Sequence, residues 1–326
     1  RAFELAMQNL VQIRKQVSVE SEAYATGLRL LSLVAYTKGL YEQGKDYATQ
    51  EVNLRKRLAP EGNAAYAEAL HNLGLYQLRL GQADKVILAL QEALAVKNIS
   101  FQKEELLRYR LLLAKAYHQH NDPAMAEYWL DKVKKDLAAL NEAHFLEAMA
   151  AYLDYQLSEG KLDEIRQQKM KSAYVALQQV HIKTQHLPEY AAMLETMAFQ
   201  YQKVQDFEEA RSLYYKLNDL YESKALSDSL RWAGILNNLG AISAKTAPDT
   251  AALWLKKSFE IQQQLGNRQD DAFWSSLDNY AMALHREGKT RQSIVLYEQY
   301  SASLMTPGES CTAMVVAMNN YAFLLK

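Results

Sequence analysis

The sequence predicts an all-α solenoid of about seven antiparallel helix pairs followed by a final helix. The main observation is internal repetition, because segments 236–240, 277–281 and 318–322 share one pattern, Leu or Met, two polar residues, Leu or Tyr, and a small residue. Their small residues, Gly240, Ala281 and Ala322, lie 41 residues apart. Gly and Pro number only 12 and 5 in 326 residues, and no stretch alternates apolar and polar residues, so we expect no sheet.

The first helix of each pair is predicted from this pattern. A fourth good match is segment 70–74, weaker units centre on Ala114 and Ala198, and degenerate units lie near Thr37 and Leu153. We therefore expect one domain over 1–326, with regular repeats in 60–135 and 190–326 and degenerate repeats in 136–189. The sequence does not begin with Met and ends on an apolar run, from which we expect a fragment of a longer protein.

A turn and a second helix are predicted to follow each first helix. Small or polar residues occupy the expected turn, namely Gly44, Gly81, Asn121, Gly160, Gln205 and Gly288. A small residue then opens an apolar stripe, as where Ala210 is followed by Leu213, Tyr214 and Leu217. Spacings of three and four place such residues on one helix face. The small residues let two helices approach closely, and the large ones fill the space between pairs.

The order of these residues resembles the tetratricopeptide repeat (TPR) family. The resemblance is carried by Leu73, Gly74 and Gly81, and by Ala198, Tyr201, Phe207, Ala210 and Tyr214. The period of 37 to 45 residues is longer than the usual repeat of about 34, and is similar to the extended repeats of kinesin light chain and of bacterial TPR arrays. The resemblance implies a right-handed superhelix whose first helices line a concave, ligand-binding surface.

Composition argues against several other classes of protein. The formal net charge is −1, so no basic excess favours nucleic acid, and no apolar run is long enough to span a membrane. Cys311 is the only cysteine, and no phosphate-binding loop or hydrolase motif is present. His118 and His120, two residues apart, point to different helix faces and make a poor metal pair. We expect no enzyme activity, no metal and no cofactor; the compartment stays open, with a slight preference for the cytoplasm.

A candidate peptide-binding site follows from one repeated position. Asn72, Asn238, Asn279 and Asn320 each lie two residues before the small packing residue. The resemblance implies that this position faces the groove, where an amide can bond the backbone of an extended peptide. Two further groups complete the predicted site: the neighbouring Asn237 and Asn319, and the basic Arg79, Lys245 and Arg286. The alternative is that these asparagines bond a loop backbone in the next unit and fix the superhelix.

Three functional hypotheses remain. The first is a non-catalytic scaffold that binds a peptide or protein in the groove, with Phe199 and Met282 as candidate apolar contacts. Leu112 at the matching place after Asn72 breaks the clamp used for chaperone C-terminal tails, so those tails are not predicted as ligands. The second is the regulatory or sensor arm of a larger bacterial effector, such as a protease, kinase or transcription regulator. The third is self-association through an open C-terminal end.

Overall fold

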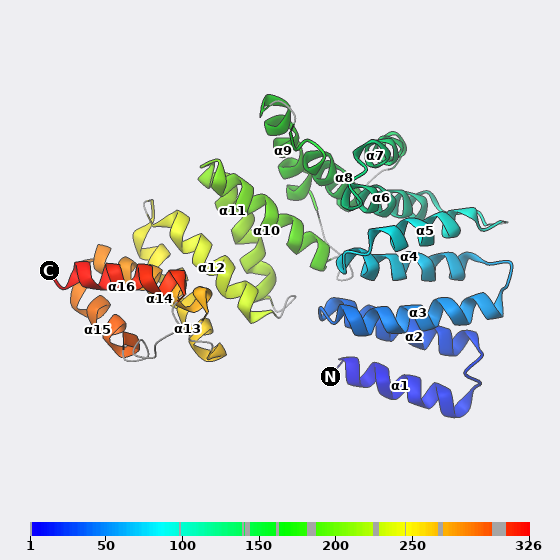
Figure 1. The fold of residues 1–326 in the computed structure, drawn as a ribbon, viewed down its shortest axis with the longest axis horizontal. Helices are drawn as coiled ribbons and strands as arrows, with labels where there is room; N and C mark the ends of the chain where they lie inside the picture. The colour runs from blue at the N-terminus through cyan, green and yellow to red at the C-terminus, as the bar shows by residue number, and fades with distance from the viewer. Residues whose placement is uncertain are drawn as a thin grey trace. The chain divides into compact units, whose positions relative to one another are not determined.

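The computed structural model consists of α-helices joined by short turns throughout the part of the chain that it describes (Figure 1). That part comprises residues 2–97, 99–138, 140, 144–160, 163–180, 187–223, 228–244, 246–266, 270–301 and 311–326. It divides into two compact units, Arg1–Gln185 and His186–Lys326, which are described separately below. The boundary falls inside the stretch where the sequence repeats are degenerate. The prediction of an all-α repeat fold is confirmed, and the residues described contain no strand.

In its described residues, the N-terminal unit contains one leading helix and four helix pairs. The leading helix is α1 (Ala2–Gln16). The pairs are α2 (Glu22–Thr37) with α3 (Tyr41–Leu58), α4 (Ala64–Arg79) with α5 (Ala83–Ala95), α6 (Lys103–Gln119) with α7 (Pro123–Leu137), and α8 (His144–Gln156) with α9 (Asp163–Gln178). In the unit's main core, buried residues run from Tyr36 to Leu157 and join neighbouring pairs.

The described part of the C-terminal unit contains three helix pairs and a closing helix. The pairs are α10 (Leu187–Lys203) with α11 (Phe207–Glu222), α12 (Ser229–Ser243) with α13 (Pro248–Leu265), and α14 (Asp271–Arg286) with α15 (Thr290–Ser301); the closing helix is α16 (Thr312–Leu324). We call α10, α12, α14 and α16 the first helices of this unit. Each second helix packs on the first helices before and after it, so the unit is a stack of neighbours.

The turns inside the pairs were predicted correctly at five of six positions. Residues Gly81, Asn121, Gly160, Gln205 and Gly288 all have a positive φ between 64° and 79°. This left-handed conformation ends a helix, and glycine adopts it without a steric cost. The asparagine and glutamine hold the same conformation without that advantage. The repeat therefore requires this backbone geometry even where glycine is absent.

Gly44 is the exception, and the prediction that it forms a turn is wrong. It lies inside α3, while Gly39, with φ of 73°, occupies the turn between α2 and α3. A Cβ atom at Gly44 would lie within 2.7 Å of the ring and hydroxyl of Tyr76. Tyr76 is buried, and its hydroxyl donates to the carbonyl of Ser32. Gly44 is therefore required for close contact between α3 and α4 rather than for a turn.

The small residues of the repeat have the packing role that the sequence predicted. Gly240 on α12 faces α13, because a Cβ there would lie 2.5 Å from the Leu255 side chain and 3.1 Å from the carbonyl of Ala251. Ala281 and Ala210 are fully buried. The stripe that follows Ala210 is also buried, with Leu213 and Tyr214 fully inaccessible. These contacts set the spacing of the helices that carry the candidate site.

Candidate functional site

The first helices of the C-terminal unit contact one another directly through polar side chains. Arg231 of α12 forms an ion pair with Glu195 of α10. Asn279 of α14 donates from Nδ2 to Oδ1 of Asn237 on α12 at 2.9 Å. The same contact recurs one repeat later between α16 and α14. Each first helix is thus linked to the one before it.

That last contact involves a buried carboxylate. Asn320 of α16 donates from Nδ2 to both carboxylate oxygens of Asp278 at 3.0 Å. Asp278 also accepts a hydrogen bond of 2.6 Å from the hydroxyl of Tyr297 on α15. The donor lies 42 residues after its acceptor in both contacts. Each first helix carries two adjacent polar residues. In both contacts, the later of the two donates to the earlier of the two on the preceding first helix.

We call the contacting side chains Asn237, Asp278, Asn279 and Asn320, together with Asn238, the polar seam. Asn238 has a partner of a different kind. Its Nδ2 donates to the hydroxyl of Tyr214 on α11 at 3.2 Å, and that hydroxyl donates to Oε1 of Gln202 on α10 at 3.2 Å. Burial raises the pKa of Tyr214 to about 12, with the bond from Asn238 opposing the shift. Burial and the bond to Asp278 also raise the pKa of Tyr297. Both hydroxyls therefore stay protonated at neutral pH and remain donors.

The structure brings together the predicted asparagines of the C-terminal unit. Asn237, Asn238, Asn279 and Asn320 lie half-buried along the seam formed by α12, α14 and α16, whereas Asn319 is exposed. The side-chain amides of Asn238, Asn279 and Asn320 each donate a hydrogen bond to another helix of the same unit. The partners are side chains of the preceding unit, whereas the alternative placed them on a loop backbone of the next unit. A role of the seam in ligand contact stays a prediction.

The remaining predicted residues are distributed differently. Asn72 and Arg79 lie on α4 in the N-terminal unit, where Asn72 is half-buried beside His71, whose ring stacks on Tyr109. Arg79 donates from Nε to the Tyr36 hydroxyl at 3.2 Å. Arg286 is exposed in the last turn of α14. Lys245 lies outside the described residues.

Three residues after the asparagine position, the first helices expose a series of apolar side chains. We call Phe199, Ala241, Met282 and Phe323, which lie 41 or 42 residues apart, the apolar row. Phe199 is 45% exposed and Phe323 is 62% exposed. Ala241 is exposed and Met282 is half-buried. Each lies on the same helix face as the preceding asparagine, or Thr196 in α10, because residues three apart are neighbours on a helix.

Part of this surface was not predicted from the sequence. Phe199 and Met282 were identified, but Ala241, Phe323 and Lys203 were not. Lys203 lies 42 residues before Lys245, at the position of the repeat that Arg286 also occupies. Applying the period to the exposed positions of every first helix, rather than to the asparagines alone, would have found all three.

Comparison with known proteins identifies the fold. No protein-family model matches the chain, and neither does any curated protein. Three solved structures cover most of it: the apo form of RapI (11% identity, TM-score 0.55, 92% of this chain and 86% of that chain), the human IFIT1 dimer with PPP-AAAA (14%, 0.52, 92% and 69%), and the C-terminal part of a TPR repeat-containing protein from Cytophaga hutchinsonii (10%, 0.50, 86% and 98%).

The chain has the TPR fold. The helix pairs, the small residues at their contacts and the recurring turn geometry are present in both units. None of the helices in the described part of this TPR chain is long and apolar enough to cross a membrane. At this level of identity, the comparisons establish the fold, and the ligand has to be argued from the surface of the first helices.

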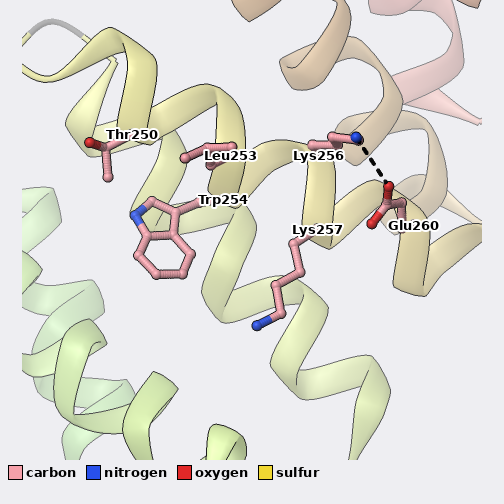
Figure 2. A pocket seen from close by; sticks show the side chains of 6 residues that line it. All are labelled: Thr250, Leu253, Trp254, Lys256, Lys257 and Glu260. Carbon is pink, nitrogen blue, oxygen red and sulfur yellow. Dashed lines mark ion pairs between the residues drawn. The ribbon is translucent and has the colours of Figure 1, made fainter.

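A second surface feature lies on the second helix α13. It is a depression of about 440 Å³ lined by Thr250, Leu253, Trp254, Lys256, Lys257 and Glu260 (Figure 2). Lys256 pairs with Glu260 at 3.7 Å, and Lys257 pairs with Glu222 at 2.8 Å. Both lysines are already neutralised within the TPR unit, so this depression offers less charge for a ligand than the first helices do.

Proposed function

We propose that the C-terminal unit is a non-catalytic scaffold that binds a peptide or protein segment across its first helices. The observation that supports this most strongly is the apolar row. Exposed apolar side chains scattered singly are normal on a protein surface. Here they recur at one position of successive repeats, and two of the four are phenylalanines. Large aromatic side chains contribute strongly to binding energy at interfaces.

The polar seam beneath the row favours this role. The hydrogen bonds of Asn279 and Asn320 fix neighbouring first helices against one another. The apolar side chains are therefore held in place before a ligand arrives. A pre-organised surface loses less conformational entropy on binding, which leaves more of the contact energy as affinity.

Selection of random peptides on the immobilised protein tests this proposal. We expect enrichment of binders whose affinity, measured by fluorescence anisotropy, falls at least about tenfold when Ala241→Glu and Met282→Glu are combined, since a charge would be buried under the ligand. Leu253→Glu is the matched control, because Leu253 is an exposed apolar residue on a second helix of the same unit. The affinity of this control variant for the enriched peptides should not change.

Two results would contradict the proposal. The first is a set of enriched peptides that bind the double variant as tightly as the wild-type protein. The second is loss of binding in Leu253→Glu alone, which would assign binding to the depression on α13. Circular dichroism of each variant confirms that the helices are intact before affinities are compared.

A second proposed activity is self-association through α16. Val315 and Leu325 are 52% and 57% exposed, whereas their counterparts one repeat earlier, Trp274 and Leu284, are 1% and 6% exposed. Residues 311–325 contain no charged side chain, so two copies of this face meet without repulsion. A two-fold symmetric contact uses the same patch on both copies. A second copy of the chain is therefore the proposed occupant.

Light scattering across a concentration series tests this contact. We expect the mass to rise above the 37.2 kDa of the single chain as concentration increases. Combined Val315→Glu and Leu325→Glu substitutions should hold the protein at the mass of one chain, whereas Leu253→Glu should not. A single-chain mass at every concentration, or association that the double variant leaves unchanged, would reject the α16 contact.

A further inference from the structure

On the first helices of the C-terminal unit, the exposed charged side chains that can meet a ligand beside the apolar row are cations. Lys203 and Arg286 are exposed in the last turns of α10 and α14. The Lys203 ammonium lies 4.8 Å from the centre of the Phe199 ring, beside the apolar row. Arg286 lies four residues after Met282 on the same helix face. No ion pair to either cation is formed within the described part of the chain.

The carboxylates of the same helices are engaged elsewhere. Glu195 pairs with Arg231, and Asp278 accepts bonds from Asn320 and Tyr297. Asp271 accepts a hydrogen bond of 2.8 Å from the backbone N–H of Ala313. Glu189, the remaining carboxylate, lies in the first turn of α10, at the opposite end from Lys203.

We infer that the ligand of this face is a peptide segment in which apolar side chains alternate with acidic ones. This inference rests on the proposed function and names the chemistry of its ligand. The apolar side chains contact Phe199, Met282 and Phe323, and the acidic ones reach Lys203 and Arg286 at the edge of the same face. Arginine binds a carboxylate through paired, charge-assisted hydrogen bonds, and lysine binds it as a point charge.

The dimensions of the face set the length of this segment. Packed helices lie about 8–10 Å apart, and a chain in the polyproline II conformation advances about 3.1 Å per residue. A segment that crosses all four first helices in this conformation therefore needs roughly eight to ten residues, with about three residues for each helix. Because polyproline II has about three residues per turn, an apolar residue at every third position lies on one side of the segment and meets one member of the apolar row after another.

The same face fits a nucleic acid less well. Affinity for nucleic acid depends mainly on cations that neutralise successive phosphates. The described part of the face provides two such cations, and the residues between them are apolar or amide side chains. An apolar row adds little to phosphate binding but contributes directly to contact with apolar side chains.

Three fluorescein-labelled synthetic peptides test the inference. They contain four repeats of Leu-Glu-Ser, of Leu-Lys-Ser, or of Ser-Glu-Ser. We expect the Leu-Glu-Ser peptide to bind about tenfold more tightly than either of the others, because only it offers apolar side chains to the apolar row and carboxylates to Lys203 and Arg286. The preference for Glu over Lys should decrease as salt is raised, since exposed charges are screened.

Charge reversal in the protein provides the second arm. Lys203→Glu combined with Arg286→Glu should invert the preference, so that the Leu-Lys-Ser peptide binds more tightly. Lys256→Glu is the matched control, because Lys256 is an exposed lysine on the second helix α13. This control variant should prefer the Leu-Glu-Ser peptide over the Leu-Lys-Ser peptide to the same extent as the wild-type protein does.

The outcomes separate this inference from the proposed function. If library-selected peptides bind the apolar row but the Glu and Lys peptides bind equally, the inference fails and the scaffold proposal stands. If no peptide from either source binds, both fail. Tighter binding of a labelled oligoadenylate than of the Leu-Glu-Ser peptide, lost on charge reversal, would also overturn the inference.

Discussion

Replacement of Arg55 by methionine is expected to lower the free energy of unfolding by about 3–5 kcal/mol at neutral pH. Arg55 and Glu51 lie one turn apart on α3 and are 5% and 1% exposed. Nε of Arg55 donates to Oε1 of Glu51 at 2.7 Å, and a terminal nitrogen of Arg55 lies 2.9 Å from Glu22. Methionine removes the cation and leaves the Glu51 carboxylate buried without its partner, which is the costly arrangement.

The size of this loss is expected to depend on pH. Burial raises the pKa of Glu51, and the hydrogen bond and charge of Arg55 oppose that shift. Without Arg55 the folded-state pKa rises further. A carboxyl whose folded pKa lies above its unfolded pKa stabilises the fold at low pH, and this contribution is lost as pH rises through the folded pKa. The variant should therefore lose more stability near pH 7.5 than near pH 5.

Urea unfolding of the full chain at both pH values measures the effect. Arg57→Met is the matched control, since Arg57 lies two residues away on α3 and forms an exposed ion pair with Glu20 at 3.4 Å. Exposed pairs contribute about 0–1 kcal/mol, so the control should lose little. Equal losses for the two variants, or a loss for Arg55→Met that is the same at both pH values, would refute the argument.

Trp274→Ala is expected to destabilise the C-terminal unit by about 3–5 kcal/mol. Trp274 is 1% exposed on α14, and its ring packs edge-on against Phe273 at 5.7 Å between centroids. Phe273 in turn contacts Phe259 of α13 and Tyr300 of α15. Removal of the indole leaves a cavity beside Phe273, and Phe273 cannot collapse into it without losing its own contacts with Phe259 and Tyr300.

The same unfolding experiment, followed by circular dichroism, measures this loss. Leu253→Ala is the control, because Leu253 is 67% exposed in the interior of α13. Alanine is a better helix former than leucine, and little apolar area is lost, so the change should be within about 0.5 kcal/mol. A control as destabilised as Trp274→Ala would mean that helix propensity, rather than core packing, sets the stability of this unit.

Local features of the fold were largely predictable from the sequence. The turns at Asn121 and Gln205 were found because they occupy the position of Gly81 in the repeat, although a positive φ is uncommon for residues other than glycine. Gly44 was misplaced because glycine serves two purposes, turning a chain and admitting a close neighbour. Its partner Tyr76 lies on the next helix, so the sequence around Gly44 holds no sign of which purpose applies.

The candidate site was predictable in position but not in its contacts. The period located Asn238, Asn279 and Asn320 on one face. Their partners depend on the tilt and rotation of neighbouring helices, which bring Asn279 beside Asn237 and Asn320 beside Asp278. Periodicity carries no information on those angles. The same period, applied to exposed residues, contains the apolar row, because exposure at equivalent places follows from the repeat itself.

The polar seam also bears on how such an array can lengthen during evolution. The first helices α12 and α14 each offer an acceptor, Asn237 and Asp278, and the donors on α14 and α16 each reach back 42 residues to it. A tandem duplication of one such unit would place a new donor opposite an existing acceptor and a new acceptor opposite an existing donor. The added junction would inherit its hydrogen bonds at once, without further substitution. Gene segments of this length can thus be copied or deleted while the remaining helices keep their alignment.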